Sequence, residues 1–214
     1  YMDEEGRIQQ FGADVGTPPA GSFKQVDAGW LLSVIGTPKG ALDHDGKLHF
    51  WGLKTGGADA QHVPDATFQQ FSLTKYAASG LDVGGLLHTW PGSEDTQDWA
   101  GWVNYASDDK PAGTYMKLES GEYGHFFCAL STASEIDCWG GNSQYDSLAA
   151  NSPPAGKFVD VQAEANHACA LDKQGGIECW GSDVDGEVED TPSSDDYKML
   201  AVGSYHNCAL AWSG

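Results

Sequence analysis

The fold is decided by the stretch Phe158-Val-Asp-Val-Gln-Ala-Glu-Ala-Asn-His-Ala-Cys-Ala-Leu-Asp-Lys-Gln-Gly-Gly-Ile-Glu-Cys-Trp-Gly181. It reads as three strands: an alternating run that opens with an aromatic residue, a Cys-Ala-Leu strand, and a strand that ends in Cys-Trp. Between the last two strands, Asp followed by Gly is typical of a hairpin turn, because Gly tolerates positive φ. The stretch therefore predicts a three-stranded antiparallel unit.

The same pattern recurs five times along the 214 residues. The openings begin at Pro19, Pro64, Pro111, Pro154 and Pro192, and the closings are Trp51-Gly52, Trp90-Pro91, Trp139-Gly140 and Trp180-Gly181. A period of about 40 residues with strand chemistry indicates a propeller or a solenoid. The fifth copy runs only to Cys208-Ala-Leu210, whereas the chain begins with Gly6-Arg-Ile-Gln-Gln-Phe11-Gly12, a closing without an opening.

We therefore expect an all-β fold, a five-bladed β-propeller formed by one domain, residues 1–214. The N-terminal strand would complete the last blade and close the ring, which removes the exposed strand edges of an open array. The predicted repeat units are 13–52, 53–91, 92–140, 141–181 and 182–214, the last completed by 1–12. The aromatic residues that recur once per copy are expected to pack the core between units. These residues are Phe11, Trp51, Trp90, Trp139 and Trp180.

The composition excludes some partners. Lys and Arg number 11 against 31 Asp and Glu, a formal net charge of −20. Nucleic-acid phosphates and anionic lipids both require a basic surface, so neither is expected as a partner. No apolar run is long enough to span a membrane. Solubility in a salty or extracellular setting accounts for the acidity, with cation binding or a basic partner as the alternative. We expect a monomer.

The cysteines are placed in pairs. Cys128 and Cys138 flank one hairpin, and Cys169 and Cys179 have the same spacing in the next. In other copies the two positions hold Gly40 with Phe50 and Ser79 with Thr89, so they change together, as facing residues on adjacent strands do. We expect two cross-strand disulfides and a secreted protein, extracellular or periplasmic, with reduced core thiols as the alternative. Cys208 aligns opposite Gln10 and is expected to be a free thiol.

These motifs resemble the regulator of chromosome condensation (RCC1-like) repeat family. The segments Phe158–Gly181 and Tyr197–Leu210 match its pattern closely, and Tyr115–Gly140 matches with two extra residues before Cys128. The units that open at Phe23 and Phe68 are degenerate. The Cys-Ala-Leu and Cys-Trp-Gly versions look like secreted bacterial members. The resemblance implies a propeller that binds a protein through one face.

Candidate ligand-binding residues follow the small-residue turn in each copy, where one loop per blade converges. They are Trp30, Tyr76, Tyr123, His125, Asn166, His167, Tyr205 and His206. Aromatic rings with imidazoles suit stacking on a sugar or anchoring a protein loop. The alternative for the histidines is a structural role, in which they close each turn by hydrogen bonds. The long insertion between Pro91 and Pro111 adds Trp99 and Trp102, with two alternatives: they form a second binding lip, or they hold the loop in place.

A third signal is the acidic segment Asp183-Val-Asp185-Gly-Glu187. Alternating carboxylates around Gly resemble part of a Ca²⁺ loop, so these three are candidate metal ligands. A solvated acidic turn is the favoured interpretation, and no other cofactor is expected.

The favoured function is a secreted binding module that recognises a protein or a glycan through the aromatic and histidine-rich face. No nucleophile elbow, phosphate loop or zinc-protease helix is present. The alternative is a carbohydrate-active enzyme, a polysaccharide lyase or glycosidase, with Tyr123, His125, His167, Tyr205 and His206 as acid and base candidates. A structural domain cut from a larger protein is the third hypothesis.

Overall fold

The computed structural model describes residues 2–10, 16–28, 39–52, 63–74, 77–91, 110–121, 126–141 and 152–212. Within these ranges the strands form five antiparallel sheets, and each sheet lies inside one predicted repeat unit. The first sheet holds β1 (Phe23–Ala28), β2 (Lys39–Asp43) and β3 (Leu48–Trp51); the second, β4 (Phe68–Leu73), β5 (Ala77–Asp82) and β6 (Leu87–Pro91); the third, β7 (Tyr115–Gly121), β8 (Phe126–Ser131) and β9 (Ile136–Gly140). The fourth holds β10 (Phe158–Glu164), β11 (His167–Asp172) and β12 (Ile177–Gly181), and the fifth β13 (Tyr197–Val202) and β14 (Asn207–Ala211).

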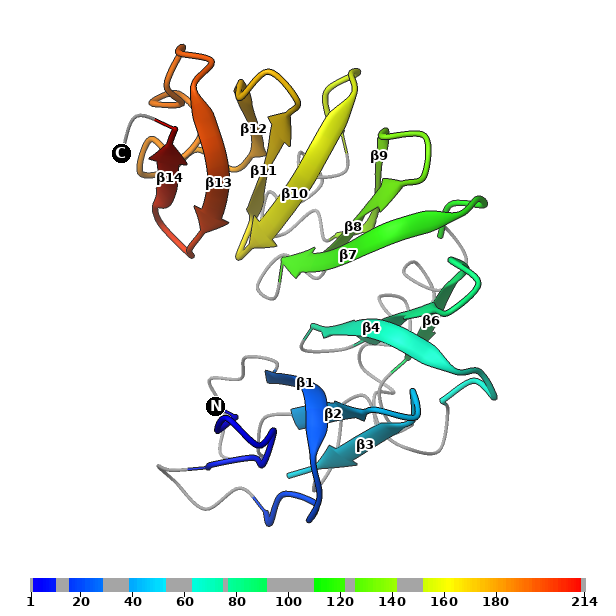
Figure 1. Ribbon diagram of the computed structural model, residues 1–214. Helices are drawn as coiled ribbons and strands as arrows, with labels where there is room; N and C mark the ends of the chain where they lie inside the picture. Colours follow the sequence, from blue (N-terminus) through cyan, green and yellow to red (C-terminus); the bar gives the residue numbers. More distant parts are fainter. Residues whose placement is uncertain are drawn as a thin grey trace, which may run out of the picture.

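The five sheets follow one another around an arc (Figure 1). The first strand of each sheet faces the middle of the arc, and the third strands lie at its outside. The two chain ends lie at the two ends of the arc, beside β1 and β14. The all-β, propeller-type arrangement is as predicted. Among the described residues, no helix has the length and hydropathy needed to cross a membrane.

The strand register confirms the predicted pairing of the cysteine positions. Cys128 faces Cys138 and Cys169 faces Cys179, and both pairs form disulfides. In the other two three-stranded sheets the same positions pair Gly40 with Phe50 and Ser79 with Thr89. Cys208 is exposed and belongs to no disulfide. The two disulfides are consistent with an oxidising, extracellular environment.

An Asp side chain closes most of the hairpin turns. In the first sheet, one Asp43 carboxylate oxygen accepts hydrogen bonds from the backbone N–H groups of Asp45 and Lys47, at 3.0 and 2.8 Å. The turn also needs a left-handed residue, which is Gly46 with φ 83°. Asp82, Asp172 and Asp3 close their own turns in the same way. The third sheet differs, because Ser134 takes the left-handed position with φ 65°.

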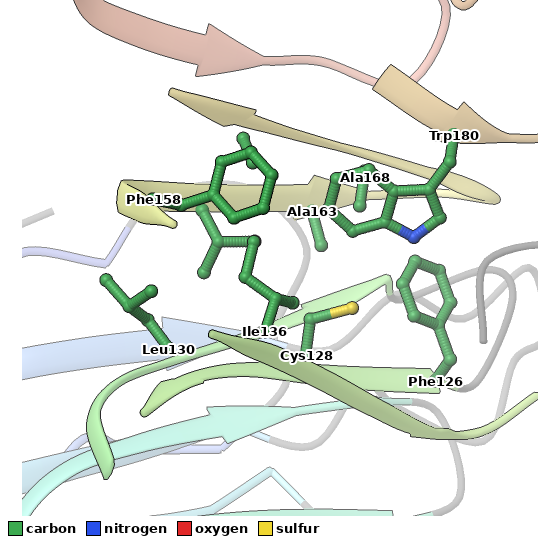
Figure 2. Packing of buried hydrophobic residues seen from close by; sticks show 10 residues of the cluster. Phe126, Cys128, Leu130, Ile136, Phe158, Ala163, Ala168 and Trp180 are labelled. Atoms are coloured by element: carbon green, nitrogen blue, oxygen red, sulfur yellow. The ribbon is translucent and has the colours of Figure 1, made fainter. Parts of the chain in front are cut away.

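The hydrophobic core consists of clusters between neighbouring sheets. The cluster between the third and fourth sheets holds Phe126, Ile136, Phe158 and Trp180, all of them buried (Figure 2). Trp180 lies above Phe126, and Phe158 faces Ile136. Trp51, Trp90 and Trp139 are buried as well, so the recurring aromatic row packs the core as predicted; Phe11 lies outside the described residues.

Hydrogen bonds also clamp each sheet to the next. The tip of each hairpin accepts a hydrogen bond from the first residue of the following sheet, as when the Phe68 N–H donates to the Gly46 carbonyl at 2.8 Å. Nearer the middle of the arc, the Gln70 side chain donates to the Leu118 carbonyl at 2.6 Å and accepts from the Leu118 N–H at 3.0 Å. Gln25 makes the same pair of bonds to Phe71.

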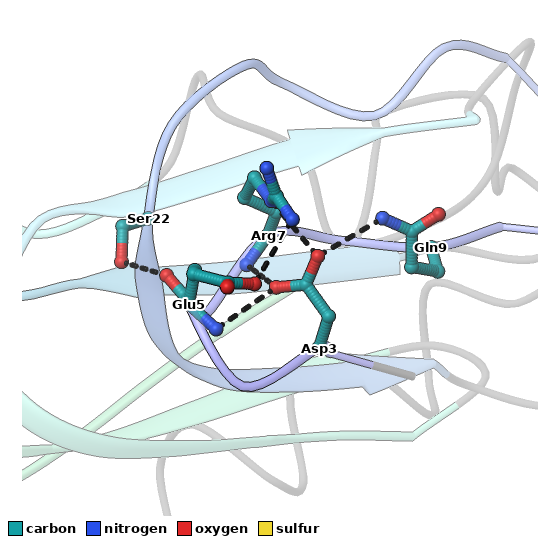
Figure 3. A network of polar contacts seen from close by, with 5 residues as sticks. All are labelled: Asp3, Glu5, Arg7, Gln9 and Ser22. Carbon is teal, nitrogen blue, oxygen red and sulfur yellow. Dashed lines mark hydrogen bonds and ion pairs between the residues drawn. The ribbon is translucent and has the colours of Figure 1, made fainter.

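Residues 2–10 form a hairpin beside the first sheet (Figure 3). Met2 bridges to Ile8, the Asp3 carboxylate accepts a hydrogen bond from the Arg7 N–H at 2.8 Å, and the Phe23 N–H donates to the Gly6 carbonyl at 2.9 Å. This N-terminal hairpin therefore docks on β1 as each other hairpin docks on the following sheet. In the described part of the chain β14 pairs with β13 alone, so ring closure through residues 1–12 stays a prediction.

Candidate functional site

A cavity lies between the fourth and fifth sheets, beside β14. Its volume is about 350 Å³. Its apolar lining residues include Ile177, Cys179, Leu200 and Ala209. Its polar lining residues include Asp185, Glu187, Asp190, Tyr205 and His206. An apolar surface with a few convergent polar groups is the usual chemistry of a ligand-binding cavity.

The loop after β12, residues 182–191, forms one wall of this cavity and is called the cavity loop below. The Asp183 carboxylate accepts a hydrogen bond from the Val188 N–H at 2.9 Å, and the buried Glu187 carboxylate accepts one from the Asp185 N–H at 2.8 Å. Such local bonds from carboxylates to backbone stabilise a compact turn. The Asn207 side chain of β14 then donates to the Glu187 carbonyl at 2.7 Å, which holds the loop against the fifth sheet.

His167 and Asn166 lie on the fourth sheet, next to the cavity. The His167 ring is 1% exposed, and its Nε2 lies 2.9 Å from the Asn207 Oδ1. The imidazole therefore joins the fourth sheet to the fifth, a structural role different from the turn closure considered for the histidines. The Asn166 carbonyl accepts a hydrogen bond from the Ser182 N–H at 2.9 Å, at the start of the cavity loop.

The structure brings four of the predicted site residues together. Tyr205 and His206 line the cavity with Asp185 and Glu187, which the sequence suggested separately as ligand-binding and metal-binding residues. Tyr205 is 67% exposed on the turn between β13 and β14. Six other candidates lie outside the described residues: Trp30, Tyr76, Trp99, Trp102, Tyr123 and His125.

Two of the three predicted calcium ligands serve the local turn. The carboxylates of Asp183 and Glu187 accept backbone hydrogen bonds, whereas a calcium ion needs several oxygens that converge on one point. Within the ranges that the structure describes, no group of three or more His, Cys, Asp or Glu residues is placed to hold a metal ion. The calcium site stays a prediction.

The catalytic candidates receive no support as a set. Acid–base catalysis requires two groups that both reach one substrate. Tyr205 and His206 are exposed on a turn, while His167 is buried and bonded to Asn207. No observation on the described residues favours the enzyme over the binding module.

Sequence reasoning missed an acidic wall formed by Asp27, Glu119 and Glu164, which lie on the first strands β1, β7 and β10. Burial raises the pKa of all three carboxyl groups above their ordinary values. The N–H groups of Leu73 and Ala28 donate to Asp27 and oppose the rise of its pKa, as Lys117 does for Glu119.

Like charges within the acidic wall act in the same direction as burial. The charge of Asp27 further raises the pKa of Glu119, and the charge of Glu164 raises that of Asp27. A signal existed for two of the three residues, because Asp27 and Glu119 each stand four places after the aromatic that opens their unit. Their mutual approach depends on the curvature of the arc, which no sequence pattern showed.

Several solved structures are similar to this chain in fold. The ectodomain of the receptor kinase CR4 from Physcomitrella patens superposes with a TM-score of 0.66 at 17% identity, over 90% of this chain and 51% of that one. The CRINKLY ectodomain of the Arabidopsis thaliana receptor kinase ACR4 superposes with a TM-score of 0.65 at 16% identity, over 88% of this chain and 68% of that one. Prp20p from Saccharomyces cerevisiae superposes with a TM-score of 0.61 at 18% identity, over 85% of this chain and 55% of that one.

The chain thus spans between about half and two thirds of the length of these structures. No family profile and no curated protein sequence matches it. Likeness at this level of identity concerns the fold alone. Prp20 is the yeast RCC1, and this chain superposes on both of its structures with a TM-score of 0.61. The chain therefore has an RCC1-like β-propeller fold.

Proposed function

We propose that this protein is a secreted binding module that recognises a protein or a glycan through the cavity beside β14. The observation that carries the proposal is that Tyr205, His206, the carboxylates of the loop after β12 and several apolar residues line one cavity. Exposed tyrosine and imidazole rings supply contact area and hydrogen bonds at low entropic cost, which is why such residues anchor ligands.

The fold supports a protein as the ligand. Prp20p was studied for its binding to Gsp1p and histones, and yeast RCC1 was solved bound to Kap60. The comparison with this chain is one of fold, at 18% identity or less in both structures. The net charge of −20 favours a basic or neutral partner. A sugar remains the second ligand class, because Tyr205 presents an aromatic face to solvent.

Three further points belong to this proposal as predictions. They are the secreted bacterial origin, the monomeric state, and the closed ring of five blades completed by residues 1–12. The two disulfides support an extracellular location.

The test is a screen with the purified chain as bait. A phage-displayed peptide library and an oligosaccharide array are each probed with the wild-type protein, and the selected ligands are then measured on the double variant Tyr205→Ala/His206→Ala. We expect a loss of affinity of about tenfold or more, because truncated anchor side chains dominate binding. Ser204→Ala, on the same turn, is the matched control and should bind normally.

Melting curves of all the proteins should coincide, since Tyr205 and His206 are exposed. Ligands that bind the double variant as well as the wild type would remove the proposal. Turnover of anionic polysaccharides, seen as absorbance of unsaturated products, would instead support the enzyme.

A further inference from the structure

Side chains at one repeated position bridge the first strands of neighbouring sheets. This position lies two places after the aromatic residue that opens each unit, and Gln25 and Gln70 hold it in the first two sheets. Each glutamine bonds to the backbone of the next sheet, as Gln70 does to Leu118. The third sheet departs from this pattern, because Lys117 stands there and contacts a side chain, that of Asp160 in β10.

Three functional groups meet at this bridge. The Lys117 Nζ lies 2.5 Å from the Asp160 Oδ1 and 3.1 Å from the Glu119 Oε1. Lys117 and Glu119 are two places apart on β7, so their side chains leave the strand on the same face. Between 23% and 27% of each of the three side chains is exposed. The amine is thus held against one carboxylate, with a second carboxyl group beside it.

The core fixes this bridge on both sides. Leu118 follows Lys117 and Val161 follows Asp160, and both apolar residues are fully buried, in two different clusters between sheets. The Asp160 Oδ1 also accepts a hydrogen bond from the Val161 N–H at 2.9 Å. Because the two strands and the carboxylate are held in this way, the amine stays next to the same carboxyl group, which favours a reaction between them.

Glu119 has the properties of an acid–base group. Burial raises the pKa of its carboxyl group, the charge of Lys117 opposes the rise, and the charges of Asp160 and Asp27 add to it. A carboxyl group with a raised pKa keeps its proton closer to neutral pH, where it donates the proton and takes it back more readily. An ion pair between Lys117 and Asp160 does not require such a neighbour.

We propose that Lys117 and Asp160 form an amide bond, an isopeptide cross-link that joins β7 to β10, with Glu119 as the catalytic residue. The two strands are neighbouring first strands on the inside of the arc (Figure 1). The inference goes beyond the proposed function, since neither strand contributes to the lining of the cavity beside β14. The structure shows the ion pair, which is the state before the bond forms.

The covalent step is a condensation. An ammonium group has no free electron pair, so a proton first passes from the Lys117 Nζ to the Asp160 carboxylate. The amine then attacks the Asp160 Cγ as Glu119 donates its proton to the carbonyl oxygen, and the Glu119 carboxylate next takes a proton from the nitrogen. One hydroxyl group on Cγ leaves with the proton of the other as water. One positive and one negative charge are lost together, and no oxidant or co-reactant is consumed.

The first proton transfer makes the reaction slow. An ion pair stabilises the charged forms of Lys117 and Asp160, so the neutral amine is rare and the bond accumulates gradually after folding. Freshly folded protein therefore contains the ion pair. Melting comparisons of Glu119 variants are made on protein in this fresh state.

The test is the mass of the unaltered protein. Folded, purified chain is incubated near neutral pH over several days, and we expect its intact mass to fall by one water molecule. Trypsin should then fail to cut after Lys117, so that peptide 158–173 stays attached to residues 76–157 after the disulfides are reduced. Normal cleavage after Lys117 at the end of the incubation would overturn the proposal, whether or not the mass has changed.

The pair of Lys157 and Glu135 is a control within the same molecule. Its Nζ and Oε1 are 2.6 Å apart, but the two side chains are 59% and 60% exposed. Among the described residues, no second carboxylate pairs with Lys157. Trypsin should therefore still cut after Lys157 in the sample in which Lys117 has reacted. Equal cross-linking of both pairs would overturn the catalytic role of Glu119.

Two variants separate the roles of the amine and the acid. Lys117→Arg keeps a cation beside Asp160 but has no amine to acylate, so it should lose no water. Glu119→Gln keeps a polar side chain of similar size and should form the bond at least about tenfold more slowly, because an amide cannot carry the proton. Melting curves of freshly folded samples establish that both variants fold. A Glu119→Gln rate equal to that of the wild type, or water loss at this site in Lys117→Arg, would overturn the proposal.

Discussion

At the scale of single residues, the same tight hairpin turn occurs five times in the described part of the chain. One is in the N-terminal hairpin, and the others lie between the second and third strands of the first four sheets. Gly6, Gly46, Gly85 and Gly175 hold the left-handed position of these turns, with φ between 75° and 95°. Ser134 holds it in the third sheet at φ 65°. A residue with a Cβ is strained there, by about 1 kcal/mol.

Ser134→Gly should therefore stabilise the protein. The observed hydrogen bonds of this residue use its backbone alone, from the Ser134 N–H to the Ser131 carbonyl and from the Phe158 N–H to the Ser134 carbonyl, so they persist in glycine. We expect a gain of about 1 kcal/mol, or roughly 2–4 °C in melting temperature for a domain of this size. Ser193→Gly, at an exposed loop position without positive φ, is the control and should not stabilise; an equal gain there would contradict the argument.

At the scale of elements, the sheets are held in sequence by side chains of the first strands. Gln70 of β4 bridges the second and third sheets, because its one amide group bonds both the N–H and the carbonyl of Leu118 in β7. The third and fourth sheets are joined differently, by an ion pair between Lys117 and Asp160 with N and O 2.5 Å apart. Neutral and charged bridges thus occupy equivalent places.

Gln70→Ala should destabilise the contact between the second and third sheets. Two partly buried backbone groups of Leu118 would lose their partner, at a cost of about 1–3 kcal/mol each if water does not replace it. Urea unfolding should show a lower midpoint with little change in slope. Gln69→Ala removes one exposed hydrogen bond, to the Asp82 carbonyl, and is expected to change the midpoint much less. An equal decrease of the midpoint in both variants would show that the two hydrogen bonds of Gln70 to Leu118 add no particular stability.

At the scale of the whole molecule, the arc gathers negative charge at its middle. The acidic wall of Asp27, Glu119 and Glu164 comes from three different sheets, and burial keeps the pKa of each carboxyl above its ordinary value. A carboxyl group whose pKa is raised by folding contributes stability below its unfolded pKa. That stability is lost as the pH rises through the folded pKa.

Glu119→Gln should accordingly raise the melting temperature at about pH 7 and have little effect at about pH 4, where the carboxyl group is protonated in the folded protein. Lys117 keeps its ion pair with Asp160 in the variant. The measurement is melting temperature against pH for both proteins. Glu135→Gln removes an exposed carboxylate paired with Lys157 and serves as the control. A stabilisation that does not depend on pH would argue against the acidic wall.

The repeated unit follows from the sequence alone. Period-2 alternation, the Asp and Gly turns and the paired cysteine positions are local features, and their geometry follows from a few neighbouring residues. That is why the registers Gly40–Phe50 and Ser79–Thr89, the two disulfides and the buried tryptophans of the described sheets were all predictable.

Contacts between units required the three-dimensional arrangement of the sheets. The cavity joins Tyr205 with Ile177, and the acidic wall joins Asp27 with Glu119; the two residues of each pair come from different units and carry no shared sequence signal. Their approach depends on the angle between successive sheets, which is set by packing of whole faces rather than by local chemistry.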